Sequence, residues 1–180
     1  MSAQQIRIVV IIGTVRPGNY TSKAAALALD ELRSMDGVAV DVIDPAKLVL
    51  PLPGVAVDGA SSAEIQEIVK SADGVLIAGP EYHGSVSSAL KLVIENLGFP
   101  SVLAGKPVAL LGVAAGVIGA IKSLEQLRGI CSHLGSIVLP GAVSVALVQK
   151  VFNEAGECSD EATEKRIRGV GTALVEYIRR

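Results

Sequence analysis

Residues 6–19 of the chain read IRIVVIIGTVRPGN, in which the apolar run Ile8–Ile12 is followed by a glycine and a polar loop. Ile6–Ile12 has the β-branched composition of a buried strand, and Asn19–Ser34 repeats apolar residues at helical spacing. Strands that are apolar along their whole length are typical of a parallel sheet covered by helices on both faces. This strand, loop and helix therefore predict an α/β fold.

The same alternation of strand and helix continues to the end of the chain. Further strands are predicted at Val38–Ile43, Gly74–Ala78, Pro107–Val113 and Ser136–Val148, the last one broken at Pro140-Gly141. Further helices are predicted after a capping box at Ser61–Glu64, over Ser85–Leu97, over Gly119–Leu134 and over Asp160–Tyr177. Right-handed crossovers between five parallel strands favour a doubly wound sandwich with strand order 2-1-3-4-5. The length of 180 residues and the lack of a linker predict one domain, residues 1–180.

The composition narrows the classes of partner. Half of the residues are hydrophobic but only 3% are aromatic, and the net charge is −2 with no block of like charges. Neither a base-stacking surface nor a basic field for nucleic acid is expected. Gly129–Gln149 is uncharged, but its His133, serines, glycines and Pro140 do not make a membrane span, and the N-terminus does not resemble a signal peptide. We expect a soluble, cytoplasmic protein.

Cysteines and histidines are too few and too scattered to predict a metal site. Cys131 and Cys158 form no CxxC pair, and only His83 and His133 could be added to them. Both thiols are interpreted as unreactive, and His133 as a structural residue near a helix end.

In a sheet of this kind, ligands bind beyond the carboxyl ends of the strands, so the loops after the first, third and fourth strands are the candidate site. The first loop, residues 13–22, reads GTVRPGNYTS and leads into a helix N-terminus, where backbone N–H groups favour an anion. It is neither a Walker A motif nor GxGxxG. Without a lysine to reach a γ-phosphate, a phosphomonoester is favoured over a nucleoside triphosphate. The alternative is an ordinary turn with hydroxyl caps.

The second and third loops carry fewer polar side chains. The second, residues 79–85, reads GPEYHGS and presents Tyr82 as a planar ring; its alternative interpretation is a tight turn with Ser85 as a helix cap. The third, residues 112–119, reads GVAAGVIG and would let a ligand approach the backbone closely. A glycine- and alanine-rich turn serves helix packing equally well, so the third loop alone is weak evidence.

GTVRPGNYTSK, followed some sixty residues later by GPEYHGSVSSALK, resembles the NADPH-dependent FMN reductases, a flavodoxin-like family of flavin, quinone, azo-dye and chromate reductases. The resemblance extends from about Ile6 to Val145. It implies a flavodoxin-like three-layer sandwich and an enzyme whose chemistry is carried by FMN rather than by a catalytic side chain. The co-substrate implied is NADPH or NADH. The expected partner is a small-molecule electron acceptor, such as a quinone, free flavin, azo compound or chromate, reduced by ping-pong kinetics.

The resemblance also assigns roles to residues of the three loops. The FMN phosphate would be held by Thr14, Arg16, Asn19, Thr21 and Ser22; the flavin ring would be wrapped by Pro80, Glu81, Tyr82, His83 and Gly84, and flanked by Ala114, Ala115 and Gly116. His83 departs from the family, which usually has asparagine there. Either its imidazole bonds the flavin or a substrate, or its backbone alone makes the contact and its side chain faces solvent.

Two questions about function stay open at this level. The alternative to a reductase is a flavodoxin-type electron carrier that binds FMN but uses no nicotinamide; such carriers tend to be markedly acidic, which a net charge of −2 argues against. The family usually forms dimers or tetramers, so a homodimer or homotetramer is expected. The long loop Asp44–Ala60 is a candidate to cover the site or to contact a neighbouring subunit.

Overall fold

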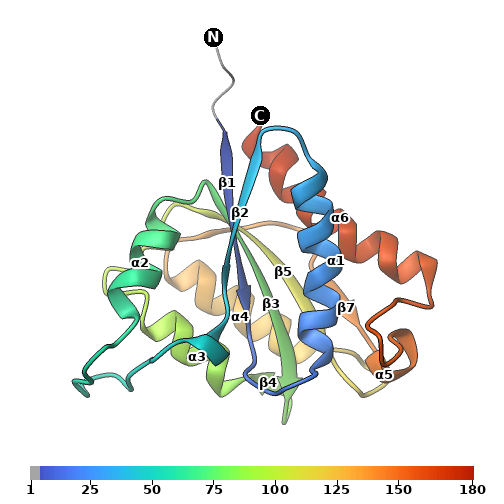
Figure 1. Ribbon diagram of the computed structural model, residues 1–180, viewed down its shortest axis with the longest axis horizontal. Coiled ribbons are helices and arrows are strands. Elements are labelled where there is room, and N and C mark those ends of the chain that lie inside the picture. Colours follow the sequence, from blue (N-terminus) through green and yellow to red (C-terminus); the bar gives the residue numbers. More distant parts are fainter. Residues whose placement is uncertain (1–4) are drawn as a thin grey trace.

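The computed structural model describes residues 5–180, which form a mostly parallel sheet between two layers of helices (Figure 1). The strands are β1 (Ile6–Ile12), β2 (Val38–Ile43), β3 (Gly74–Tyr82), β4 (Ser85–Val86), β5 (Pro107–Val113), β6 (Ile137–Val138) and β7 (Val143–Val145). They follow the order β2-β1-β3-β5-β6, while β7 also pairs with β5 and β4 pairs antiparallel with β3. The predicted order is confirmed, because β6 and β7 together are the predicted fifth strand, divided at Pro140-Gly141.

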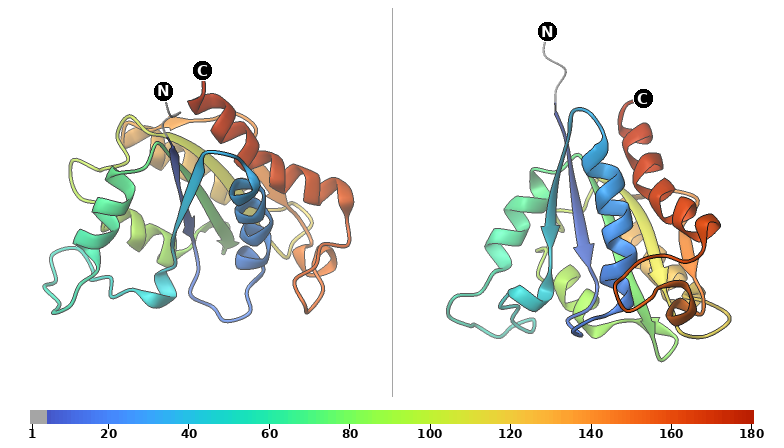
Figure 2. Two further views of the ribbon diagram at one scale, coloured as in Figure 1. Left: turned by 45° about the horizontal axis from the view of Figure 1, so that its top comes forward. Right: turned by 45° about the vertical axis from the view of Figure 1, so that its right-hand side comes forward.

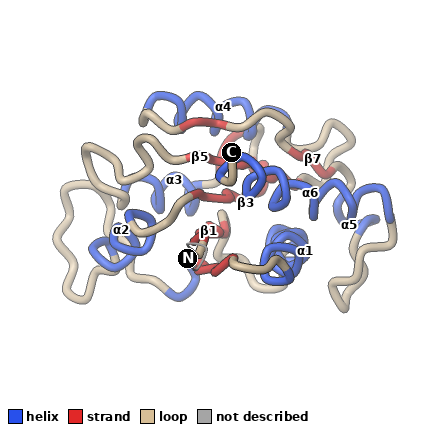
Figure 3. The backbone as a smooth tube through the Cα atoms, turned by 90° about the horizontal axis from the view of Figure 1, so that it is seen from above, coloured by secondary structure: helices blue, strands red, loops and turns tan. Residues whose placement is uncertain are grey.

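Six α-helices and one 3-10 turn connect these strands. They are α1 (Tyr20–Ser34), the 3-10 turn η1 (Pro45–Lys47), α2 (Ser62–Lys70), α3 (Ser88–Glu95), α4 (Ile121–His133), α5 (Val148–Val151) and α6 (Glu161–Ile178). Seen from above in Figure 3, α1 and α6 cover one face of the sheet, and α2, α3 and α4 cover the other. Within residues 5–180, every helix is too short or too polar to span a bilayer.

The central strands are buried on both faces, as their continuous apolar sequence predicts. Along β1, Ile8 and Val10 point into the core beneath α1 and α6, while Val9 and Ile11 point into the core beneath α2, α3 and α4. This alternation follows the two-residue period of a strand. Each of these four side chains therefore packs in the core on one face of the sheet or the other.

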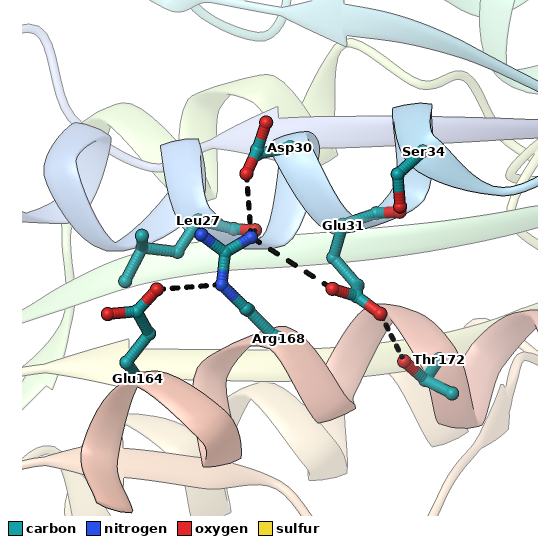
Figure 4. A network of polar contacts seen from close by, with 7 residues as sticks. All are labelled: Leu27, Asp30, Glu31, Ser34, Glu164, Arg168 and Thr172. Atoms are coloured by element: carbon teal, nitrogen blue, oxygen red, sulfur yellow. Dashed lines mark hydrogen bonds and ion pairs between the residues drawn. The ribbon is translucent and has the colours of Figure 1, made fainter. Parts of the chain in front are cut away.

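Helices α1 and α6 lie side by side, as both views of Figure 2 show, because small residues let them approach. A Cβ built on Gly171 of α6 would lie 2.9 Å from Leu32 Cγ of α1, so glycine is needed for this approach. At the edge of the contact, Arg168 of α6 donates to the Asp30 carboxylate at 2.7 Å and to Glu164 at 2.8 Å (Figure 4). The ion pairs lie at the surface, so packing is the larger contribution to this interface.

The structure corrects several predicted boundaries. Strand β3 runs on from Ala78 to Tyr82, so Pro80 lies inside a strand rather than in a loop. It can do so because β1 ends opposite Ala78, and Pro80 is paired only with Val113 of β5. The capping box at Ser61 does not form, since its hydroxyl accepts from Val49 N instead. Strand β4 and helix α5 were not predicted, because two and four residues are too few to show a period.

Candidate functional site

A groove of about 330 Å³ is lined by residues of the loop after β1 and by residues at the carboxyl ends of β3 and β5. These strand ends point toward the lower edge of Figure 1. The volume of the groove lies within the range of about 300–1,000 Å³ that small-molecule sites occupy. Of the predicted site residues, those that line this groove are Arg16, Asn19, Thr21, Pro80, Glu81, Tyr82, Ala114 and Ala115. Thr14 and Ser22 line a neighbouring depression of about 580 Å³ instead, and His83, Gly84 and Gly116 line neither.

The first loop offers backbone donors at the start of α1. Asn19 is the N-cap: its Oδ1 accepts from Ser22 N at 2.7 Å, and its Nδ2 donates to Arg16 O at 2.7 Å. The Asn19 side chain is thus occupied by the turn itself. Within residues 5–180, the N–H groups of residues 18–21 donate to no acceptor outside α1, and the first residues of a helix have none inside it. Four successive donors and the exposed Arg16 therefore face the groove with capacity to bind an anion.

Thr14 joins the first loop to the second. Its side chain is only 3% exposed, its Oγ1 accepts from Arg16 N at 3.2 Å, and it lies 3.3 Å from the Tyr82 hydroxyl. This hydroxyl pair spans 68 residues of sequence. Thr14 therefore fixes the distance between the two loops, a role that sequence alone did not suggest.

Residues 82–85 form a tight β-hairpin rather than an irregular loop. Tyr82 pairs with Ser85, and the two residues between them both have positive φ, 51° at His83 and 70° at Gly84. Positive φ at both central positions defines a type I′ turn, for which Asn-Gly is the preferred sequence. Asparagine and histidine are both enriched at positive φ, so His83 meets the same backbone requirement as asparagine. Its side chain is exposed.

Pro80 creates a gap in the sheet that Ser87 fills. Gly13 N donates to Ala78 O at 2.7 Å, and the next bond of this parallel ladder would be donated by residue 80 to Gly13 O. Proline has no N–H to donate. The buried Ser87 hydroxyl donates to Gly13 O in its place, and it also accepts from Leu90 N as the cap of α3. The cap of α3 is therefore Ser87, and the alternative interpretation that made Ser85 the helix cap is wrong.

Glu81 turns its carboxylate away from the groove and toward α4. Its Oε2 accepts from Ser123 N at 3.1 Å in the first turn of that helix, whose own N-cap residue, Ala120, provides no side-chain cap. A carboxylate at a helix N-terminus is stabilising. The Glu81 side chain thus supports α4, and only the remainder of the residue is available to the groove.

The third loop is held from the far end of the sheet. Ala114 N donates to Val145 O at 2.9 Å, and Val148 N donates to Ala114 O at 3.1 Å. Val148 of α5 consequently becomes a wall of the groove. Val148 is the last residue of the stretch predicted as the fifth strand, and this was the signal available in the sequence, since every parallel strand ends at this same edge. Tyr20 also lines the groove, so that Tyr20 and Tyr82, two of the five aromatic residues of the chain, are both among its lining residues.

The remaining candidates lie outside the groove. Burial raises the pKa of the Cys131 thiol to about 12, which makes it a poor nucleophile. His133 is exposed in the last turn of α4. Among residues 5–180, no three histidine, cysteine or carboxylate side chains are grouped closely enough to hold a metal ion.

The sheet order and the groove beyond its strand ends define a flavodoxin-like protein. Solved structures agree: the chain superimposes on the flavoenzyme NAD(P)H:(acceptor) oxidoreductase of Paracoccus denitrificans with a TM-score of 0.79, at 22% identity and 97% coverage of each chain. A flavodoxin from the domain Archaea gives a TM-score of 0.65 at 14% identity, covering 96% of this chain and 98% of the other. At these identities the likeness establishes the fold.

Sequence comparison establishes the family. The NADPH-dependent FMN reductase profile matches residues 6–150. The quinone reductase of Escherichia coli (strain K12) is 30% identical, with 99% of this chain and 98% of that protein covered. An NADPH azoreductase of Bacillus sp. (strain OY1-2) is 31% identical over 84% of this chain and 83% of that protein. The chain belongs to the NADPH-dependent FMN reductase family, which confirms the predicted enzyme class and FMN with NAD(P)H as cofactor and co-substrate.

The groove fits FMN by the chemistry of its walls. The first loop contributes the Arg16 guanidinium and the N–H groups of residues 18–21, which have no protein acceptor outside α1 within residues 5–180; these groups suit a phosphate dianion. The strand ends and α5 contribute Pro80, Val113, Ala114 and Val148, which suit a flat, largely apolar ring.

Proposed function

We propose that this groove is the FMN site. In this proposal the phosphate is held by the side chains of Arg16 and Thr21 and by the N–H groups of residues 18–21. Asn19 contributes its backbone and closes the turn with its side chain, while Thr14 and Ser22 support the loop from the neighbouring depression. Pro80, Glu81, Tyr82, His83 and Gly84 border the ring from the hairpin, and Ala114, Ala115 and Gly116 border it from the third loop. The observation that carries the proposal is that segments far apart in sequence line one groove, the first loop with anion donors and the other segments mainly with apolar residues.

Bound FMN would supply the hydride and electron transfer between NAD(P)H and the acceptor. The chain supplies binding, orientation and electrostatics. Within residues 5–180, the N–H groups of His83 and Gly84 at the hairpin tip donate to no protein acceptor. Such fixed donors stabilise negative charge as it develops in a bound ligand. This division of labour needs no catalytic acid or base from a side chain.

We further propose that the acceptor is a small molecule, such as a quinone, free flavin, azo compound or chromate. Relatives named quinone reductase and NADPH azoreductase support this range. NADPH differs from NADH by a 2′-phosphate, and the sequence shows no phosphate-binding motif besides the first loop that would select for it. Both NADPH and NADH are therefore candidate donors. Steady-state oxidation of each nicotinamide against each acceptor tests this, and parallel lines in double-reciprocal plots are expected for ping-pong exchange at one site.

We also propose that residues 1–180 act as one domain in a homodimer or homotetramer located in the cytoplasm. Support for assembly comes from a second groove of about 500 Å³ between the loop after β2 and helix α3, bordered by the exposed Val15 and Leu52. Exposed apolar patches of this kind are typical of protein contacts. Light scattering coupled to size exclusion tests this: a monomeric mass at micromolar concentration would contradict it.

Arg16 offers the sharpest test of the binding site. Its guanidinium forms no hydrogen bond or ion pair within residues 5–180, so Arg16→Ala disturbs little of the protein itself. A hydrogen bond to a charged group contributes about 1.5–3 kcal/mol, so FMN affinity should fall roughly 10- to 100-fold while riboflavin, which lacks the phosphate, is almost unaffected. Fluorescence quenching of each flavin measures this, with Arg33→Ala at the other end of α1 as the matched control. Equal losses for both flavins would refute the phosphate assignment.

A further inference from the structure

The His83-Gly84 hairpin is too short to hold its own shape. Its second strand, β4, has two residues, and only two residue pairs join it to β3. An isolated two-stranded hairpin is marginal in water even when it is longer. The position of its tip therefore depends on what supports it from outside.

That support comes from one side chain of α4. Gln126 Oε1 accepts from Ser85 Oγ at 2.7 Å and from Val86 N at 3.5 Å, while its Nε2 donates to Gly84 O at 3.4 Å. A single amide thus contacts three consecutive residues of the hairpin. Both its carbonyl and its amino group are used, in the orientation that suits each partner.

Gln126 belongs to a rigid connection across the site. It lies three residues after Ser123, so both residues occupy one face of α4. Ser123 N donates to the carboxylate of Glu81, which directly precedes the hairpin. The start of α4 is in turn tied to β7, because Ala120 N donates to Ser144 Oγ at 2.8 Å. The hairpin is therefore fixed to the far side of the sheet through α4, and to the first loop through the Tyr82 hydroxyl and, directly after β4, through Ser87.

We propose that Gln126 is a positioning residue that sets how the His83-Gly84 backbone meets the flavin ring. This inference rests on the proposed FMN site. Gln126 does not line the groove, and it acts by holding the hairpin beside the groove, whose tip N–H groups meet the ring in the proposed site. Its loss should weaken recognition of the ring and leave recognition of the phosphate unchanged.

The test compares Gln126→Met with Glu125→Met. Both positions are exposed on α4, and the two changes remove a polar end group from side chains of similar length, but only Gln126 contacts the hairpin. We expect Gln126→Met to raise the dissociation constants of FMN and riboflavin by the same factor, about three- to tenfold, the scale of one neutral hydrogen bond. The visible absorption band of bound FMN should shift toward that of free flavin. Glu125→Met should match the parent protein in both measurements.

A double-mutant cycle separates positioning from general destabilisation. Ser85→Ala and Gln126→Met remove the same hydrogen bond, so the double variant should bind riboflavin no more weakly than Gln126→Met alone. Gln126→Glu keeps the acceptor for Ser85 and loses the donor to Gly84 O. The riboflavin affinity of this variant should therefore lie between those of the parent and of Gln126→Met. If Gln126→Met does not fold, Gln126→Glu provides the test in its place.

The outcomes distinguish this inference from the proposed site. If the parent protein binds neither flavin, the proposed FMN site is wrong and this inference falls with it. If the parent binds both flavins and Gln126→Met behaves like Glu125→Met, the inference alone is overturned. A loss confined to FMN, or effects of Ser85→Ala and Gln126→Met that multiply, would also overturn it.

Discussion

Replacing Ser87 with alanine should destabilise the protein far more than its size suggests. The hydroxyl is 2% exposed and has two partners: it donates to Gly13 O, and it accepts from Leu90 N at 3.1 Å. Losing a helix N-cap costs about 0.5–2 kcal/mol. Leaving the Gly13 carbonyl buried without a donor costs about 1–3 kcal/mol more. We therefore expect the free energy of unfolding to fall by about 2–4 kcal/mol.

Urea denaturation measures this change, with an unchanged m-value expected because the surface exposed on unfolding is the same. Ser88→Ala is the matched control, since Ser88 is the exposed next residue and forms no side-chain hydrogen bond within residues 5–180. Its effect should stay within about 0.5 kcal/mol. A Ser87→Ala variant as stable as Ser88→Ala would refute the reasoning.

Pro80 provides a second test of the same argument. Pro80→Ala restores the N–H that the ladder lacks at Gly13 O, so the carbonyl gains a new donor. In that background, Ser87→Ala should cost only the cap, about 1 kcal/mol. An equal cost of Ser87→Ala with Pro80 and with Ala at position 80 would show that the hydroxyl does not substitute for the missing N–H.

Three further changes have outcomes fixed by particular contacts. Gly171→Ala should lower the free energy of unfolding by about 1–3 kcal/mol, because the added methyl group overpacks against α1. At Gly169 an added methyl group meets nothing within 4 Å, so Gly169→Ala should raise the free energy of unfolding by up to about 1 kcal/mol through its higher helix propensity. Urea denaturation compares the two variants. His83→Asn should bind FMN and riboflavin as the parent does, because asparagine also adopts the positive φ of this position. His83→Val should destabilise the hairpin, because a β-branched residue is strained at positive φ. A fall in FMN affinity for His83→Asn would instead assign the imidazole a binding role. Backbone N–H groups at the start of α6 donate to the Asp160 carboxylate and lower its pKa. The ionised carboxylate therefore stabilises the folded protein at pH values above the pKa of about 4 that the group has in the unfolded chain. This stabilisation is lost as the pH falls through the lowered pKa of the folded protein. Asp160→Ala should therefore be less stable than the parent at pH 7, and the difference should close below about pH 4; a difference independent of pH would contradict this.

The sequence by itself determined the layers of the fold. The continuous apolar runs at Ile8–Ile12 and Pro107–Val113 are typical of strands buried on both faces, and the helical spacing between them predicted the helices that cover these faces. Chain-order rules then limited the strand order, which the structure confirms. The loops of the candidate site followed from the same rules, because every parallel strand ends at one edge.

Only the tertiary structure decided which partner each polar side chain of these loops takes. Glu81 turns to the first turn of α4, Asn19 closes its own turn, and Thr14 meets Tyr82. The Asn19 contacts are local, with partners three residues away, but the contacts of Glu81 and Thr14 join residues 42 and 68 positions apart, and no local pattern encodes them. The type I′ hairpin and Gln126, which holds it, belong to the same class. Periodicity specifies which face of an element is buried, whereas the partner of a hydroxyl or amide is fixed by distance and direction after the layers have packed.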